Sequence, residues 1–253
     1  MTWTITGKHV LITGGTSGIG RATAAQLARL GAHVTITSRR LATAEDAADE
    51  LSVATGNEVE PAELDLSSLD AVRTFATAYT DRHDRLDILV NNAGTMAGKR
   101  RTTVDGHEWI FAVNHLGPFL LTNLLTPLLI DSAPARVITV SSENHRGARH
   151  GLDFDDLQMT SGYSSSKAYA ASKLANILFT VELDRRLRDQ GVTADALHPG
   201  VVATSFGKGQ EGPRWMSLAM TVLAPVLKEP SRGAETSVFL ATADSDEIDA
   251  AVY

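Results

Sequence analysis

Short apolar runs alternate with longer segments of helical periodicity along the whole chain, and this alternation restricts the possible fold more than any other feature. Short apolar runs between turn residues are typical of buried strands, and apolar residues repeated every three or four positions are typical of helices. Such alternation produces βαβ units and a parallel sheet covered by helices on both faces. We expect strands at residues 9–13, 34–37, 58–64, 86–90, 135–140 and 192–197, and helices at residues 18–30, 69–81, 104–130 and 168–190, with a further helix ending near residue 51.

The composition of the chain excludes several kinds of site and partner. A net charge of −7 argues against nucleic acid as a partner, because phosphate binding requires a basic surface. The absence of cysteine excludes disulfides and thiolate chemistry, and the eight histidines show no spacing typical of a metal site. The N-terminus lacks a long apolar run, so we expect no signal peptide, no membrane anchor and a cytoplasmic location.

A glycine-rich turn stands between the first expected strand and the first expected helix. It reads Thr13-Gly-Gly-Thr-Ser-Gly-Ile-Gly20. The N-terminus of a helix attracts phosphate, and glycine lets the main chain approach a phosphate without a Cβ clash. The G-x-x-x-G-x-G spacing differs from the commonest dinucleotide-binding pattern. The turn is either a pyrophosphate site or only a tight strand-to-helix connection, and its place in a βαβ unit favours the first interpretation.

These features predict the α/β class, with a single Rossmann-fold domain over residues 1–253. Its doubly wound parallel sheet would have about seven strands flanked by helices. A chain of 253 residues can bury one large core, and no linker or repeat marks a domain boundary. We expect residues 1–140 mainly to bind the cofactor and residues 141–253 to supply the catalytic and substrate-binding elements.

A tyrosine with a lysine four positions later occurs twice, as Tyr163 with Lys167 and as Tyr169 with Lys173. Residues at this spacing share one helix face, so the ammonium can lie near the phenol. A nearby cation favours the phenolate and lowers the phenol pKa from about 10 toward the range that suits general acid–base catalysis. Either pair alone also fits an ordinary solvated helix surface.

The order of these motifs resembles the short-chain dehydrogenase/reductase family over nearly the whole chain. The other motifs that carry the resemblance are Asn91-Asn-Ala-Gly94, Asn114, Ser142, the Tyr-x-x-Ser-Lys pattern and His198-Pro-Gly200. Residues 113–125 and 172–180 further resemble the retinol-dehydrogenase-like branch. The resemblance implies an NAD(P)-dependent oxidoreductase that interconverts an alcohol and a carbonyl compound, with the hydride supplied by the cofactor.

The resemblance also assigns four catalytic roles. Tyr169 would donate a proton to the carbonyl oxygen during reduction and accept the hydroxyl proton during oxidation. Lys173 would lower the pKa of Tyr169 and hydrogen-bond the nicotinamide ribose. Ser142 would stabilise the charge that develops on the reacting oxygen. Asn114 would hold a water molecule that links Lys173 to solvent.

Both tyrosine–lysine pairs satisfy the family pattern, so the residues after each pair decide the choice. Ser-Lys-Leu-Ala-Asn after Tyr169 matches the retinol-dehydrogenase-like branch, and the residues after Lys167 do not. We therefore assign catalysis to Tyr169, and expect Tyr163 at the surface of a loop or first helical turn, as a candidate wall of the substrate pocket. Ser142 is preferred over Ser141 because the family places the catalytic hydroxyl second.

The end of the second expected strand favours NADP(H) over NAD(H). NAD-selective folds commonly place a carboxylate there, whereas this chain has Ser38, Arg39 and Arg40. Arginine would bind a 2′-phosphate through charge-assisted hydrogen bonds, although two loop arginines can also be simple solvated charge. The expected cofactor contacts are Gly14, Thr16, Ser17, Gly18, Ile19, Gly20, Ser38, Arg39, Arg40, Asp65, Leu66, Asn92, Ala93, Gly94, Tyr169, Lys173, Pro199, Gly200, Val202 and Thr204.

The segment after the last expected strand mixes glycines with apolar residues. Residues 206–229 predict a mobile lid over a lipophilic pocket, or a helix that only packs on the core. We expect a small lipophilic ketone, aldehyde or alcohol as substrate, and the family implies a homodimer or homotetramer built on residues 104–130 and 168–190. The alternatives are a non-catalytic cofactor-binding or sensor protein of the same fold, and an NAD-linked isomerase or dehydratase.

Overall fold

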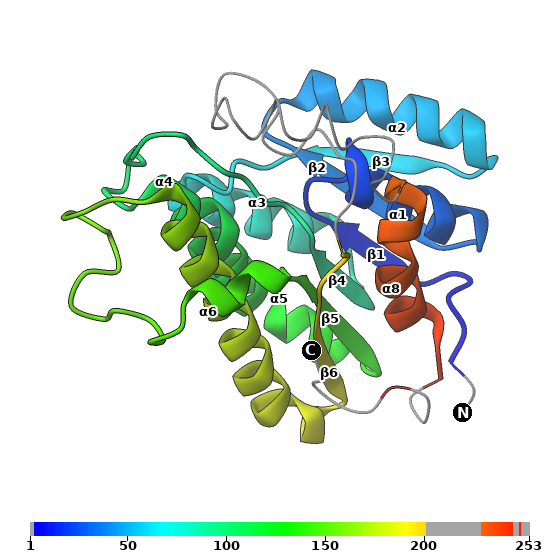
Figure 1. Ribbon diagram of the computed structural model, residues 1–253. Coiled ribbons are helices and arrows are strands. Elements are labelled where there is room, and N and C mark those ends of the chain that lie inside the picture. The colour runs from blue at the N-terminus through cyan, green and yellow to red at the C-terminus, as the bar shows by residue number, and fades with distance from the viewer. Residues whose placement is uncertain (1–2, 201–228, 245–247, 249–253) are drawn as a thin grey trace.

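A parallel sheet with helices on both faces forms the frame of the molecule in this computed structural model (Figure 1). The structure describes residues 3–200, 229–244 and 248. The strand order is β3-β2-β1-β4-β5-β6, and each strand is parallel to its neighbours. The order changes direction between β1 and β4, which is the point where doubly wound sheets open a crevice for ligands.

The elements confirm the α/β class and the doubly wound sheet, with six strands in the described residues where about seven were expected. The strands are β1 (His9–Ile12), β2 (His33–Ser38), β3 (Val59–Glu63), β4 (Ile88–Asn91), β5 (Ala135–Val140) and β6 (Val192–Leu197). The α-helices are α1 (Gly18–Arg29), α2 (Leu41–Thr55), α3 (Leu69–Arg82), α4 (Trp109–Phe111), α5 (Gly117–Asp131), α6 (Ser165–Leu187) and α8 (Pro230–Thr242). A π-helical turn η1 (Ala112–Leu116) joins α4 to α5, and two short 3-10 helices are η2 (Glu143–Gly147) and η3 (Arg188–Gln190).

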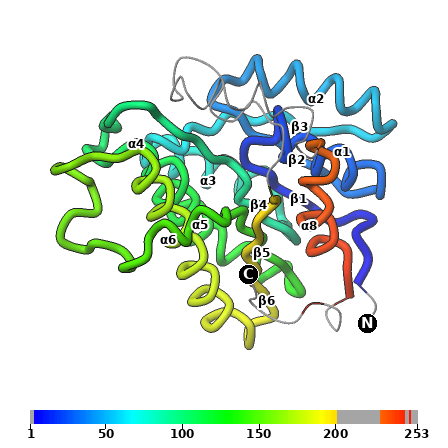
Figure 2. The backbone as a smooth tube through the Cα atoms, in the orientation of Figure 1, coloured from blue at the N-terminus to red at the C-terminus, as the bar shows by residue number. Residues whose placement is uncertain are grey.

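Alternate side chains of the strands enter two hydrophobic clusters, one on each face of the sheet. Leu11 of β1 packs in the cluster formed with α3, α5 and α6, and its neighbours Val10 and Ile12 pack in the cluster formed with α1, α2 and α8. Figure 2 shows the two groups of helices on opposite sides of the strands. Because a strand turns successive side chains to opposite faces, an apolar run without polar interruption is what a sheet covered on both faces requires.

The helix expected over residues 104–130 begins later than predicted, at Trp109. The residues before it form a turn, in which Thr102 pairs with Glu108 in an isolated antiparallel bridge. Glu108 then caps the helix, because its Oε2 accepts a hydrogen bond from Phe111 N at 2.7 Å. Val104 resembles the first apolar residue of a helix but is 87% exposed on this turn.

The helical run from Trp109 to Asp131 is, within the described residues, the one segment long and apolar enough to cross a membrane by length and composition. It connects β4 to β5, which pair directly in the sheet. Its residues Leu121, Leu125 and Leu129 are completely buried in the core. The place of this helix in the core therefore accounts for much of its apolar character.

Candidate active site

Side chains predicted to be catalytic gather beyond the carboxyl end of β5. Ser142 is the second residue after β5, and its side chain hydrogen-bonds the Tyr169 hydroxyl of α6. Lys173, one helical turn after Tyr169, donates from Nζ to the Val140 carbonyl at the end of β5 at 2.8 Å. Neighbouring Ser141 donates instead to the Lys173 main-chain oxygen at 2.8 Å. The strand end thus holds the start of α6 through both its main chain and its serines.

Burial sets the protonation of the tyrosine and the lysine. Tyr169 is 8% and Lys173 is 3% exposed, and Lys173 Nζ lies 5.7 Å from the centre of the Tyr169 ring. Burial lowers the pKa of Lys173 to about 8. Burial also raises the pKa of Tyr169 to about 12, against the opposite effect of the hydrogen bond with Ser142. Burial is thus the largest effect on the pKa of Tyr169 in this structure, and it acts in the opposite direction to the lowering that the motif predicts.

Asn114 lies in the π-helical turn η1, on the side that faces α6. It is completely buried, and its Oδ1 accepts from Thr95 N at 2.7 Å. Its Nδ2 donates to Thr95 O and to Ser172 Oγ, both at 3.1 Å. Both amide hydrogens are therefore used within the protein, and one lone pair of Oδ1 remains to accept from a water molecule. A π-helical turn inside a helix is frequent at functional sites.

Sequence reasoning missed the residues that orient Asn114. Ser172 Oγ also donates to the Tyr169 carbonyl at 2.7 Å, so it joins the two catalytic candidates. Its position inside the Tyr-x-x-Ser-Lys motif was a signal that could have identified it. Asn176 donates to the main-chain oxygen of Asn114 at 3.0 Å, and its place at the end of the Ser-Lys-Leu-Ala-Asn motif could have identified it.

The glycine-rich turn has the geometry that a dinucleotide pyrophosphate requires. Gly14 and Gly18 have φ angles of 65° and 54°, in the left-handed region that favours glycine. A Cβ at Gly20 would lie 2.3 Å from Asn92 Nδ2 and 2.5 Å from the Gly14 carbonyl oxygen. Ser17 precedes α1 without a side-chain cap, so the first N–H groups of the helix are available to an anion. These residues fit a bound pyrophosphate.

The segment after β4 is hydrogen-bonded to the glycine-rich turn after β1. Asn92 Nδ2 donates to the carbonyl oxygens of Thr13 at 2.8 Å and Gly14 at 3.1 Å. In return, Thr13 Oγ1 accepts from the main-chain N of Asn92 and of Ala93, each at 3.0 Å. Thr13 was not among the expected cofactor contacts. Its buried hydroxyl instead fixes two of the residues that were, and its place at the start of the glycine-rich motif could have indicated this.

The residues expected at the adenine end lie after β2 and β3. Ser38 is half-buried at the end of β2, and Arg39 and Arg40 are exposed beyond it. Asp65 Oδ1 accepts from Ser67 N at 2.9 Å, which shapes the turn before α3, and Ser68 caps that helix. Leu66 is 5% exposed, and a Cβ at Gly117 would lie 2.5 Å from its carbonyl oxygen. The start of α5 therefore approaches this turn backbone to backbone.

The nicotinamide end is described in part. Pro199 and Gly200 follow β6 at the same edge of the sheet, and Gly200 has a φ angle of 75°. Val202, Thr204 and the expected lid at 206–229 lie outside the described residues, apart from residue 229.

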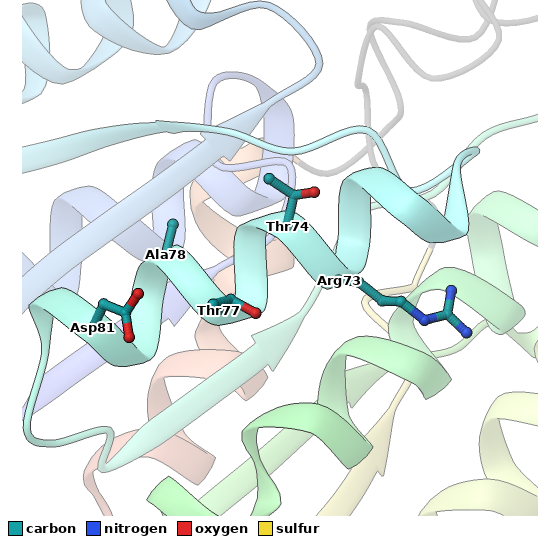
Figure 3. A pocket seen from close by; sticks show the side chains of 5 residues that line it. All are labelled: Arg73, Thr74, Thr77, Ala78 and Asp81. Carbon is teal, nitrogen blue, oxygen red and sulfur yellow. The ribbon is translucent and has the colours of Figure 1, made fainter.

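A hollow on the outer surface of α3 is separate from the residues described above. It is lined by Arg73, Thr74, Thr77, Ala78 and Asp81. Figure 3 shows that these side chains leave one helix in different directions and do not converge. Within residues 3–200, 229–244 and 248, no group of three or more histidine, aspartate or glutamate side chains could hold a metal ion.

Comparison with curated proteins gives close relatives. Residues 8–213 match the family model of the short chain dehydrogenases. The chain is 44% identical to Retinol dehydrogenase 13 of Homo sapiens over 247 residues, which cover 95% of this chain and 74% of that protein. It is 45% identical to Retinol dehydrogenase 12 of Mus musculus over 244 residues, which cover 96% of this chain and 76% of that protein.

Solved structures agree with this relationship. An uncharacterized protein from Mycobacterium paratuberculosis has 36% identity and a TM-score of 0.75, over 99% of this chain and 83% of that chain. A metagenomic short-chain oxidoreductase in complex with NADP has 27% identity and a TM-score of 0.71, over 97% of this chain and 95% of that chain. The chain therefore belongs to the short-chain dehydrogenase family, in its retinol-dehydrogenase-like branch, and is an NAD(P)-dependent oxidoreductase that acts on CH–OH and C=O groups.

Proposed function

We propose that this protein uses NADP(H) to interconvert a small lipophilic ketone or aldehyde and its alcohol, with Tyr169 as the general acid and base. The observation that carries the proposal is the buried Tyr169 hydroxyl, which hydrogen-bonds Ser142 one helical turn from Lys173. The names of the relatives, which are retinol dehydrogenases, support a lipophilic alcohol or carbonyl substrate.

Each of the four side chains has a distinct task in carbonyl reduction. The nicotinamide supplies the hydride. Ser142 donates a hydrogen bond to the carbonyl oxygen, and Tyr169 transfers its proton to this oxygen as negative charge develops there. The Lys173 ammonium stabilises the phenolate that remains. A water molecule that donates to Asn114 Oδ1 would then pass a proton from solvent by way of Lys173 to the tyrosine, and oxidation would use the same groups in the reverse order.

The proposed cofactor contacts divide between the two parts of the chain. Residues 1–140 supply the glycine-rich turn, the adenine end and the segment after β4, and residues 141–253 supply Tyr169, Lys173 and the contacts after β6. Arg39 and Arg40 support a preference for NADP(H), because they stand where a carboxylate would repel the 2′-phosphate. The NADP bound to a structural relative is consistent with this preference.

An apolar surface on α5 and α6 supports a homodimer. Phe119 and Leu178 are 44% and 51% exposed, and the rings of Phe119 and Phe179 lie 5.0 Å apart between the two helices. Leu124 and Val181 extend the same surface at 38% and 47% exposure. Large apolar side chains that are exposed together on neighbouring helices indicate an interaction site. We propose that a second copy of the chain covers it.

The alternative is a sensor that binds the cofactor without turnover. A binding protein has no use for a buried tyrosine, serine and lysine that can move a proton. The complete set at Ser142, Tyr169 and Lys173 therefore favours the enzyme.

The test of the proposal is the reduction of aliphatic aldehydes and retinal by the purified protein with NADPH, in the wild type and in Tyr169→Phe. We expect the variant to lose about 10²–10⁴-fold in kcat, because it lacks the proton donor. Its binding of NADPH, followed by energy transfer from tryptophan to the reduced nicotinamide, should remain close to that of the wild type. Unchanged turnover in Tyr169→Phe would exclude this residue as the acid. A wild type that binds cofactor and reduces no carbonyl would favour the sensor.

A further inference from the structure

The tyrosine of the first tyrosine–lysine pair meets a buried carboxylate. Tyr163 Oη lies 3.3 Å from Glu108 Oε1, and the Glu108 side chain is completely buried. The other carboxylate oxygen already caps the helix at Phe111 N. Tyr163 itself is half-buried and packs against the hydrophobic cluster, rather than lying on the surface as expected. Its environment thus differs from that of Tyr169, which faces Ser142 and a lysine.

The chain just before Tyr163 is fixed to the same glutamate. Gln158 Oε1 accepts from Glu108 N at 2.6 Å, and the Gln158 carbonyl accepts from Arg100 Nε at 3.1 Å. Met159 comes next with a φ angle of 45°, the one positive φ angle of a non-glycine residue in the described part of the chain. Backbone strain of this kind persists only where the surroundings hold it. We call residues 156–163 the anchored segment.

The Asp156 carboxylate accepts hydrogen bonds from main-chain N–H groups of the same anchored segment. It accepts from Thr160 N at 2.9 Å and from Ser161 N at 3.2 Å. Met159 and Tyr163 turn their side chains toward the cluster that also contains Tyr169. The anchored segment, between η2 and α6, is therefore a loop that is held by its own hydrogen bonds and packs its apolar side chains on the core.

The anchor lies at the start of both helices that carry the proposed catalytic residues. Glu108 is the N-cap of α4 and stands six residues before Asn114. Tyr163 stands six residues before Tyr169 and immediately before Ser164, the N-cap of α6. Figure 1 shows that the loop leading into α6 runs past the beginning of α4. Met159 and Tyr163 pack on the cluster that contains Tyr169, so a displacement of the anchored segment would change the packing around Tyr169.

We propose that Tyr163, through Glu108, is a positioning residue that holds the anchored segment as a fixed wall of the cleft for the lipophilic substrate. Tyr163 therefore increases the affinity for the substrate and takes no part in proton transfer. Burial and the negative charge of Glu108 raise the pKa of Tyr163, which makes it a poorer acid than a free phenol. The proposal rests on the carbonyl–alcohol activity proposed above, and it gives the first tyrosine–lysine pair a role that does not compete with the second.

Steady-state kinetics with decanal and NADPH test the proposal in Tyr163→Phe, which removes only the hydroxyl. We expect the KM for decanal to rise about three- to tenfold, the effect of one lost hydrogen bond. The kcat, its pH profile and the Kd for NADPH should stay at the wild-type values. Lys167→Ala is the matched control, because Lys167 is exposed and belongs to the same pair, and it should change none of these quantities.

Amide hydrogen exchange at Thr160 and Ser161 gives a second reading that needs no turnover. We expect faster exchange at both amides in Tyr163→Phe and wild-type exchange in Lys167→Ala. Unchanged exchange overturns the anchor, whatever the kinetics show. Faster exchange with an unchanged KM overturns the assignment of the segment as a substrate wall.

Two further outcomes separate this proposal from the proposed activity. A large fall in kcat with an altered pH profile in Tyr163→Phe would make Tyr163 the proton donor and overturn both assignments. If the wild type reduces no aldehyde, the proposed activity fails. The calorimetric Kd for decanal then replaces the KM, and an equal Kd in wild type and Tyr163→Phe overturns the wall.

Discussion

The Lys173 ammonium lies 5.7 Å from the centre of the Tyr169 ring, and the Val140 carbonyl holds it there through a 2.8 Å hydrogen bond. The positive charge is therefore fixed by the main chain at the end of β5. Electrostatic catalysis depends on charges that are in place before the reaction begins. A cation with this anchor needs little reorganisation when the phenol loses its proton.

Lys173→Met should make the protein more stable and nearly inactive. The pKa of Lys173 falls from 10.5 to about 8 on folding because of burial, which corresponds to about 3 kcal/mol of unfavourable free energy. The lost hydrogen bond to Val140 offsets about 1 kcal/mol. We expect the free energy of unfolding at pH 7 to rise by about 2 kcal/mol, and kcat to fall about 10²–10⁴-fold.

The pH dependence of this stability gain has a defined sign. Below a pH of about 8, Lys173 is charged in both the folded and the unfolded protein, so the penalty is complete. Between about 8 and 10.5 the folded protein has released the proton and the unfolded protein has not, so the wild type recovers stability as the pH rises. Urea unfolding of Lys173→Met and of Lys167→Met as control should show this trend. A destabilised Lys173→Met at neutral pH contradicts it.

Arg39→Ala should weaken the binding of NADPH and leave the binding of NADH unchanged. A charge-assisted hydrogen bond to the 2′-phosphate accounts for a rise of about tenfold or more in the Kd for NADPH. Parallel titrations of both cofactors measure the difference. Arg29→Ala, an exposed arginine in the last turn of α1, is the control. Equal effects on the two cofactors would remove the argument for NADP(H) selectivity.

Leu178→Arg should convert the proposed homodimer into a monomer. Leu178 is 51% exposed on the apolar surface of α5 and α6, and an arginine there would bring two positive charges together across a twofold interface. Sedimentation equilibrium of the wild type and the variant measures the mass. Val53→Arg, at an 88% exposed position on α2, should keep the wild-type mass. An unchanged mass in Leu178→Arg would place any contact between copies elsewhere.

Acid should destabilise the protein through His9, at the amino end of β1. The rings of His9 and His33 are 4.9 Å apart, and those of His9 and His83 are 6.4 Å apart. Burial, and then the charge of His33, lower the pKa of His9 from 6.5. The unfolded chain therefore binds the proton more readily, and the free energy of unfolding falls as the pH decreases through 6.5.

His9→Gln should reduce this dependence on pH. Urea unfolding at a pH of about 7.5 and of about 5.5 measures it, on either side of the ordinary histidine pKa. His150→Gln, at an exposed position, is the matched control and should behave as the wild type does. If His9→Gln loses as much stability as the wild type between the two pH values, His9 is not the responsible group.

Local signals in the sequence were sufficient for the sheet and for the turn that begins α1. The six expected strands agree with the structure to within one or two residues, because an apolar run between turn residues depends on nearby sequence alone. The start of α4 was wrong, since Val104 resembles a helical apolar position and its exposure depends on the turn closed by Thr102 and Glu108. The π-helical turn at Asn114 has no comparable local signal.

Long-range contacts explain most of what the sequence left open. Tyr163 meets a glutamate 55 positions away, so its partial burial could not be deduced from its neighbours in the chain. The raised pKa of Tyr169 has the same origin, because the motif shows the lysine and does not show the packing that dehydrates the phenol. The order of the motifs was enough to name the candidate catalytic residues, and the pKa values of these residues depend on how the folded chain buries them.

The approach of Gly117 to Leu66 has a consequence for how such an enzyme can diversify. The two residues meet through their backbones, between the proposed adenine end and the helix that carries Asn114. The distance between the turn after β3 and the start of α5 is therefore set by the main chain at this contact, and not by the size of a side chain. The anchored segment before α6 takes no part in this contact. On its proposed role as a substrate wall, replacement of residues 156–163 would change the substrate range and leave this main-chain contact intact.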